Sequence, residues 1–124
     1  MNKLTTKWFK KWAKRNKLNN QTLIDAIQNL ESGLSSVDLG QHLFKVRVRR
    51  ENAGKSSGYR TIILYKKHDK AVFIHGFGKN EKGNIDQQEF QYFKKLGQTL
   101  MAMNPKQVEM AIKDKILFSL EDEK

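Results

Sequence analysis

The strongest constraint on the fold is a run near the middle of the chain in which apolar and basic residues alternate. The even positions of this run carry the apolar residues Phe44, Val46 and Val48, and the odd positions carry the basic residues Lys45, Arg47 and Arg49. Successive side chains of a strand point to opposite faces, so a period of two predicts a strand over residues 43–50. One face of the sheet is then buried, and the other is cationic.

Two further strands are predicted after this one. Residues 59–65 form a nearly continuous apolar run, and residues 71–77 form another. The glycine-rich segment 53–58 and the charged segment 66–70 are short enough to connect consecutive strands as turns. The three strands therefore form an antiparallel meander. Residues 116–120 are compatible with a short fourth strand or with the end of a helix.

Helices are predicted on both sides of these strands. A first amphipathic helix covers residues 5–17, with Trp8, Phe9 and Trp12 at helical spacing and assigned to packing. A second helix follows residue 20 and ends before Gly33, and the two form a hairpin joined to the sheet by a polar link over residues 35–40.

The C-terminal third of the chain carries two further helix signals. Asp86 is a predicted N-cap, and Glu89 three residues later completes a capping box. Asn104 ends this helix, and Pro105 suits the first position of a short last helix. The predicted fold is therefore α+β, with a helical hairpin, a three-stranded antiparallel sheet or a four-stranded one, and C-terminal helices. Residues 1–124 form a single domain.

The charge of the chain points to a polyanionic partner. Lys and Arg number 24 against 13 Asp and Glu, which gives a formal net charge of +11. Seven of the basic residues lie within residues 1–17, which contain no acidic residue, and nine lie within residues 45–70. Such a field attracts nucleic acid over several ångströms. A basic surface that serves only solubility is the alternative.

Several classes of chemistry lack support in the sequence. The chain has no cysteine, and its three histidines, His42, His68 and His75, lack metal-ligand spacing. We therefore expect no metal site and no small-molecule cofactor, and we assign His75 to the core or to a sheet edge. The sequence has no apolar run long enough for a membrane span and no signal-peptide core, so a soluble, cytoplasmic protein is expected.

Basic residues are the remaining candidates for function. In an antiparallel meander the turn after the first strand and the exit of the third lie at the same end. Lys55, Arg60 and Lys79 can therefore converge on one phosphate. Cleavage of RNA through its 2′-hydroxyl needs a base, an acid and a cation for the oxyanion, which such residues can supply. The charge pattern alone favours binding over cleavage.

Three ordered motifs resemble the RelE/ParE toxin superfamily, and most closely its HigB-like branch. They are Leu-Phe-Lys-Val-Arg-Val-Arg over residues 43–49, Gly-Lys-Ser-Ser-Gly-Tyr-Arg over 54–60 and Phe-Ile-His-Gly-Phe-Gly-Lys-Asn-Glu over 73–81. The likeness spans about residues 40–103. It implies a compact α+β toxin that cleaves mRNA on the ribosome and is neutralised by an antitoxin protein containing a helix-turn-helix.

The resemblance also assigns roles to residues. It implies that a set of basic residues holds and cleaves the RNA: Arg47, Arg49, Lys55, Arg60 and Lys79. Among the candidates we expect Arg60, Lys79 and Lys55 to be catalytic and a second set to bind RNA: Lys45, Arg47, Arg49, Asn80 and Lys82. Two alternatives stay open at this point. ParE-type members of the same superfamily poison DNA gyrase through protein binding, and a basic surface can bind RNA without cleaving it.

Overall fold

Four helices and six strands make up the part of the chain that the computed structural model describes, which is residues 1–34, 36–49, 58–78 and 85–121. In chain order they are β1 (Asn2–Thr6), α1 (Lys7–Arg15), α2 (Asn20–Glu31), β2 (Ser36–Gly40), β3 (Leu43–Val48), β4 (Tyr59–Lys66), β5 (Lys70–Gly78), α3 (Gln87–Met101), α4 (Pro105–Lys113) and β6 (Leu117–Ser119).

The strands form one mixed sheet in the order β2-β3-β4-β5-β1-β6. The meander β3-β4-β5 is antiparallel as predicted, whereas β1 runs parallel to β5. The prediction of a three-stranded or four-stranded antiparallel sheet was therefore wrong in strand number and in strand direction. β6 pairs with β1, which settles the open reading of residues 116–120 in favour of a strand.

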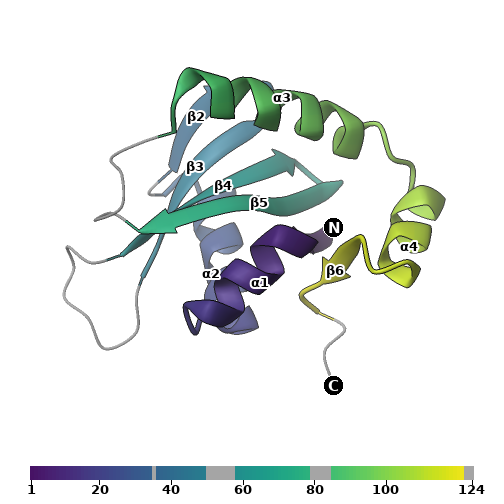
Figure 1. Cartoon of the computed structure of the whole chain (residues 1–124), viewed down its shortest axis with the longest axis horizontal. Coiled ribbons are helices and arrows are strands. Elements are labelled where there is room, and N and C mark those ends of the chain that lie inside the picture. The colour runs from purple at the N-terminus through teal and green to yellow at the C-terminus, as the bar shows by residue number, and fades with distance from the viewer. Residues whose placement is uncertain (35, 50–57, 79–84, 122–124) are drawn as a thin grey trace.

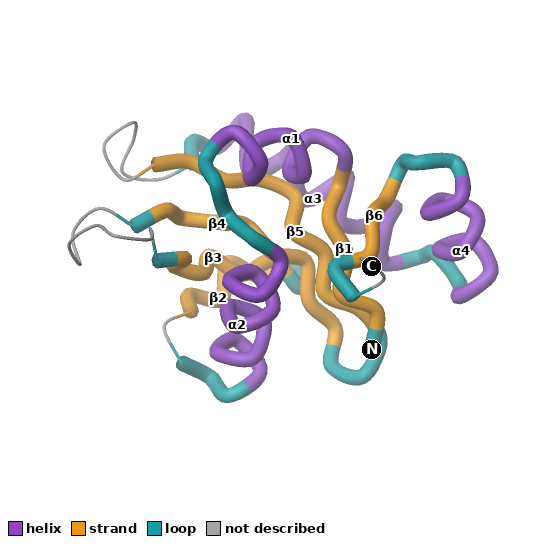
Figure 2. The backbone as a smooth tube through the Cα atoms, turned by 90° about the horizontal axis from the view of Figure 1, so that it is seen from below, coloured by secondary structure: helices purple, strands orange, loops and turns teal. Residues whose placement is uncertain are grey.

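Helices cover both faces of the sheet (Figure 1). α1 packs against β5 and α2 against β3 on one face, and α3 lies across the other face (Figures 1 and 2). Each face has its own apolar core. The α1 and α2 core is centred on Phe9, Ile27 and Phe73, whereas the α3 core, which α4 also joins, is centred on Ile62 and Phe93. The side chains of one sheet thus alternate between two separate cores.

The N-terminal segment differs from its prediction. The helix predicted over residues 5–17 begins at Lys7, because residues 2–6 form β1. Thr6 ends the strand and caps the helix, since its hydroxyl accepts a hydrogen bond from the Phe9 amide at 3.2 Å. Leu4 is the one large apolar side chain in this strand, so no alternation marks it. Its position is determined by pairing with β5, which lies more than 60 residues away.

The polar link predicted over residues 35–40 is also a strand. β2 pairs with β3 at the edge of the sheet, and its residues are half-buried or exposed. Val37 is 51% exposed, so the strand lacks the buried face that a sequence pattern reveals. An edge strand of this kind is held by backbone pairing with its neighbour rather than by burial of side chains.

The other helices follow their predicted boundary signals. In α3, Asp86 and Glu89 form the predicted capping box, with reciprocal hydrogen bonds of 2.8 and 3.0 Å. α4 begins at Pro105 behind the cap Asn104, and Gly33 lies beyond α2 with a φ of 74°. The longest of the described helices, α3, has 15 residues. No helix in the described ranges is long and apolar enough to cross a membrane.

A buried lysine connects the start of β5 to the end of α3. Lys70 is 1% exposed, and its ammonium donates hydrogen bonds to the carbonyl oxygens of Leu100 at 2.9 Å and Met103 at 2.7 Å. These carbonyls lie at the C-terminal end of α3, where the helix dipole favours a cation. Lys70 therefore fixes the end of α3 over the beginning of β5.

We predict that Lys70→Met destabilises the fold. Methionine fills a similar volume but cannot donate, so each carbonyl left without a donor costs about 1–3 kcal/mol. Urea unfolding measures the loss. Lys66→Met is the matched control, because Lys66 pairs with Lys70 across the turn but is exposed, and it should change stability by less than about 0.5 kcal/mol. Equal stability of the two variants would contradict the prediction.

Candidate nucleic-acid interface

Three strand ends meet at one end of the sheet. Val48 at the end of β3 pairs with Tyr59 at the start of β4, and Tyr59 pairs with Gly78 at the end of β5. The chain therefore leaves β3, enters β4 and leaves β5 at the same place, as the meander predicted. Segments 50–57 and 79–84 are attached here, so the predicted site residues Lys55, Lys79, Asn80 and Lys82 lie outside the described residues.

The predicted basic residues on β3 and β4 lie on a single face of the sheet. Lys45 and Arg47 alternate with the buried Val46, and Arg60 is the register partner of Arg47. Arg60 shares its parity with Ile62, which belongs to the α3 core, so the three basic residues face the same side as α3. We call Lys45, Arg47 and Arg60 the cationic row. Arg49 is exposed and follows immediately after β3.

Arg47 and Arg60 place two like charges at directly opposite positions of neighbouring strands. Directly opposite residues of neighbouring strands have Cβ atoms about 5 Å apart, and like charges there are destabilising. Neither arginine forms an ion pair with a carboxylate in the described ranges. Within the same ranges, Arg60 Nη1 is buried and has no hydrogen-bond partner. An anion between two arginines held in this way would offset their repulsion.

A glycine makes room for this arrangement. A Cβ at Gly58 would lie 3.2 Å from Arg47 Nε and 3.0 Å from the Val48 carbonyl oxygen. Because Gly58 has no side chain, the side chain of Arg47 can lie against the backbone at the start of β4. The glycine in the motif 54–60 thus has a packing role beside the cationic row.

Aromatic residues border the cationic row along β5. The register between β4 and β5 shifts after Ile62, and this bulge directs His75 toward α3. The His75 ring lies 4.8 Å from Phe93 and 4.7 Å from Trp8. Phe77, two residues further along β5, is the register partner of Arg60. The prediction that His75 lies in the core or at an edge agrees with this position, but its place beside the cationic row was not predicted.

One acidic residue belongs to the same group. The Glu89 carboxylate accepts the capping bond through Oε1, and its Oε2 lies 3.8 Å from His75 Nε2. The predicted capping role of Glu89 is therefore confirmed, and its second role at His75 was missed. The capping box placed Glu89 at the start of α3, but the sequence could not show that this turn lies over His75.

The assignment of the aromatic residues of α1 to packing needs one correction. Phe9 and Trp12 are buried, and the Trp12 ring fills the space above Gly76, where a Cβ would be 2.4 Å from it. Trp8, however, is 46% exposed. The spacing placed all three residues on one helical face, but Trp8 lies in the first turn, beyond the end of β1, and packs on the sheet edge at His75.

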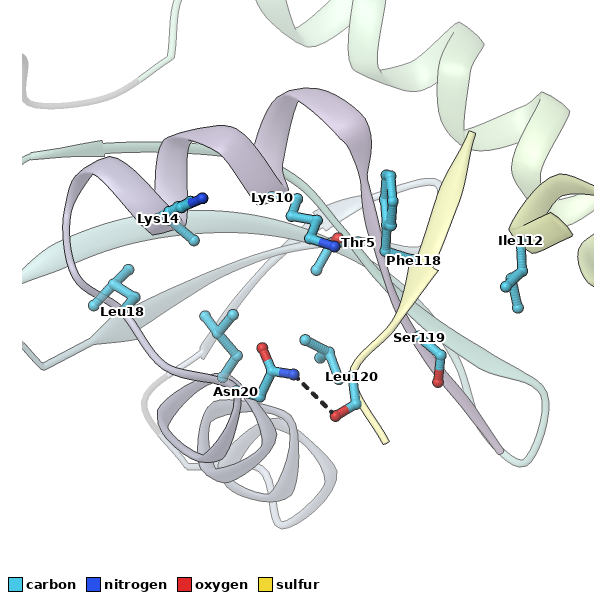
Figure 3. A pocket seen from close by; sticks show the side chains of 11 residues that line it. Thr5, Lys10, Lys14, Leu18, Asn20, Ile112, Phe118, Ser119 and Leu120 are labelled. Carbon is cyan, nitrogen blue, oxygen red and sulfur yellow. Dashed lines mark hydrogen bonds between the residues drawn. The ribbon is translucent and has the colours of Figure 1, made fainter. Parts of the chain in front are cut away.

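A cavity of about 570 Å³ lies on the opposite face of the sheet, between α1, α2, α4 and β6 (Figure 3). Its wall is mainly apolar, and Asn20 at its edge donates a hydrogen bond of 3.2 Å to the Leu120 carbonyl oxygen. None of the predicted site residues lines it. In the described ranges, no three His, Asp or Glu side chains group together as metal ligands would.

We predict that Arg60→Met does not destabilise the free protein. The substitution removes a like-charge neighbour of Arg47 and a buried donor without a partner, so the free energy of unfolding should stay equal or rise by up to about 1 kcal/mol. Urea unfolding at low salt tests this. Arg15→Met is the control, because Arg15 lies in the last turn of α1 and its loss should cost a few tenths of a kcal/mol. A loss above about 1 kcal/mol for Arg60→Met would show that Arg60 is structural.

Comparison with known proteins places the chain in a family. No curated protein matches the chain. Residues 1–120 match the family described as the RelE toxin of the RelE/RelB toxin-antitoxin system. The match extends beyond residues 40–103, on which the sequence resemblance rested, and includes β1, both N-terminal helices and β6. It confirms that resemblance at the level of the family. The chain belongs to the RelE toxin family.

Proposed function

We propose that this toxin is a ribosome-dependent endoribonuclease that cleaves mRNA through the 2′-hydroxyl. The observation that carries the proposal is the Arg47 and Arg60 pair, because two guanidinium groups on neighbouring strands, without an acidic partner among the described residues, suit a phosphate or its transition state. Guanidinium groups bind phosphate oxygens in a bidentate manner. The family match supports the toxin role, and the endonuclease activity is the specific function that this site fits.

The reaction needs three groups from the protein: a general base, a general acid and a cation. A base takes the proton of the 2′-hydroxyl, whose oxygen attacks the adjacent phosphorus. The bond from phosphorus to the 5′-oxygen breaks, and an acid protonates that oxygen, which leaves a 2′,3′-cyclic phosphate and a 5′-hydroxyl. A cation stabilises the charge on the phosphate oxygens in the transition state. Arg60 serves as this cation, and Lys55 and Lys79 serve as base and acid.

The remaining predicted residues hold the RNA strand. Three of them lie along β3 or just after it: Lys45, Arg47 and Arg49. An RNA strand that crosses this end of the sheet would pass over them. Asn80 and Lys82 complete the predicted RNA-binding set from the segment after β5. Contacts of this kind position the backbone and carry little sequence information, so codon choice would come from the ribosome and from base contacts.

The partner of the protein follows from the family. A toxin of a RelE/RelB system has a RelB antitoxin, and we propose that this antitoxin contains a helix-turn-helix. Its binding would prevent cleavage either by covering the cationic row or by keeping the toxin away from the ribosome. mRNA held on the ribosome is the proposed substrate.

We predict that Arg60→Ala and Lys79→Ala each abolish cleavage. Removal of one transition-state contact costs about 10²–10³ in rate, whereas Lys66→Ala, an exposed lysine at the other end of β4, should have little effect. Arg60→Lys keeps the charge but loses the planar fork, so it should recover only part of the rate. The measurement is cleavage of a message on programmed ribosomes by each purified variant.

Three results would contradict this assignment in different ways. Full cleavage by both alanine variants would place the catalytic groups elsewhere, with Arg47, Arg49 and Lys55 next. An inactive wild-type toxin that inhibits DNA supercoiling would replace the nuclease with the gyrase-directed activity. RNA binding without either activity would leave a non-catalytic RNA-binding protein.

A second prediction concerns salt. Each phosphate contact with single-stranded RNA releases condensed counterions, so the logarithm of affinity should fall with the logarithm of salt concentration by about 0.7 per contact. Arg47→Ala should make this slope shallower by about that amount. Affinity measured between low and physiological salt tests it. A slope near zero would show that phosphate contacts do not drive binding.

A further inference from the structure

An aromatic ring that is only partly buried lies beside the cationic row. Trp8 is 46% exposed, whereas Phe9 and Trp12 in the same helix are 0% and 5% exposed. Its indole stacks on the His75 ring, with 4.7 Å between centroids and 25° between planes. A large apolar ring that stays half exposed loses much of the stabilisation that burial would provide. The position is therefore a candidate for contact with a partner.

The ring is held by rigid elements on both sides. His75 belongs to β5. Its ring contacts Trp8 and also packs against Phe93 of α3, with 4.8 Å between the His75 and Phe93 ring centroids. The Glu89 carboxylate lies 3.8 Å from His75 Nε2 and is itself fixed by the α3 cap. Trp12, one turn along α1, lies nearly parallel to Trp8 at 6.4 Å. Trp8 thus has little freedom to lose when a ligand stacks on it.

The aromatic residues connect Trp8 to the cationic row. His75 and Phe77 have ring centroids 6.1 Å apart, and Phe77 is the register partner of Arg60. Two exposed lysines of α1 flank Trp8. Lys7 precedes it directly, and Lys11 follows it by three residues and therefore lies on the same side of the helix. A basic surface that leads to an aromatic ring is the arrangement by which proteins bind single-stranded nucleic acid.

We propose that Trp8, supported by His75, is a stacking site for an unpaired nucleobase of the RNA strand whose phosphate lies at Arg47 and Arg60. The proposal adds a base-binding site to the proposed function and rests on it for the identity of the ligand. Stacking accepts any base, so the site would increase affinity and orient the strand rather than select a sequence.

The experiment compares two oligonucleotides with the same number of phosphates. One is single-stranded RNA with 2′-O-methyl sugars, which cannot be cleaved, and the other has abasic positions in its centre. The full-length wild-type protein should bind the first more tightly by roughly 5-fold to 150-fold, the range given by one stacked base. Trp8→Leu should bind both equally, because it keeps apolar bulk without a ring. Trp8→Phe should restore part of the preference.

A readout without substitutions accompanies these variants. The chain has two tryptophans, and Trp12 is buried, so quenching of tryptophan fluorescence by RNA reports mainly on Trp8. The base-containing strand should quench it, and the abasic strand should not. Arg60→Ala serves as the matched control, since it should weaken binding of both strands by the same factor and leave the base preference intact.

The outcomes separate this proposal from the proposed function. If Trp8→Leu keeps the full base preference while cleavage depends on Arg60, the stacking site is wrong and the nuclease stands. If the wild type shows the Trp8-dependent preference but cleaves no message, the nuclease is wrong and the RNA-stacking site stands. If Trp8→Leu leaves RNA binding unchanged but weakens the complex with the antitoxin, Trp8 is a protein contact and the proposal is overturned.

Discussion

The buried ammonium of Lys70 holds the C-terminal end of α3 over the start of β5, and the candidate site depends on the position of this helix. From that end, α3 packs along the sheet through an apolar core that includes Phe93 and Ile62. Its first turn therefore reaches His75, where Glu89 both closes the capping box and approaches the imidazole. The Lys70 hydrogen bonds at the start of β5 thereby help to position Glu89 and His75 near the other end of the same strand.

The cationic row shows the opposite relation between stability and function. Arg47 and Arg60 face each other across a strand pair, and Arg60 Nη1 has no partner among the described residues. In the free protein this arrangement is unfavourable, and an anion would offset it. The sheet around the pair is buried on both faces, with Ile62 and Ile63 fully covered, so the scaffold has enough stability to hold two like charges in place. The rigid strands also fix their separation.

The sequence predicted the elements whose stability is local. The alternation over residues 43–50 gave β3 and its cationic face, and Asp86 and Asn104 gave the starts of α3 and α4. β1 and β2 were not predicted, because neither has a pattern of buried residues of its own. β1 is held by pairing with the distant strand β5, and β2 is held by pairing with β3 at the edge of the sheet. The same reason applies to the site. Arg47 was predicted from the alternation in β3 and Arg60 from the meander, whereas the approach of Trp8 and Glu89 to His75 depends on two helices that contact β5 from different parts of the chain.

The parallel strand β1 explains why an N-terminal helix takes part in the site at all. β1 pairs with β5 only from Lys70 to Phe73, so on that side the remainder of β5 has no partner strand among the described residues. The chain turns into α1 at this point, and its first aromatic residue, Trp8, lies against His75 in this part of β5. Trp12, one turn later, packs over Gly76 on the other face. α1 therefore protects the open edge of β5 from both sides, and the ring that does so beside the cationic row is the one left accessible to a ligand.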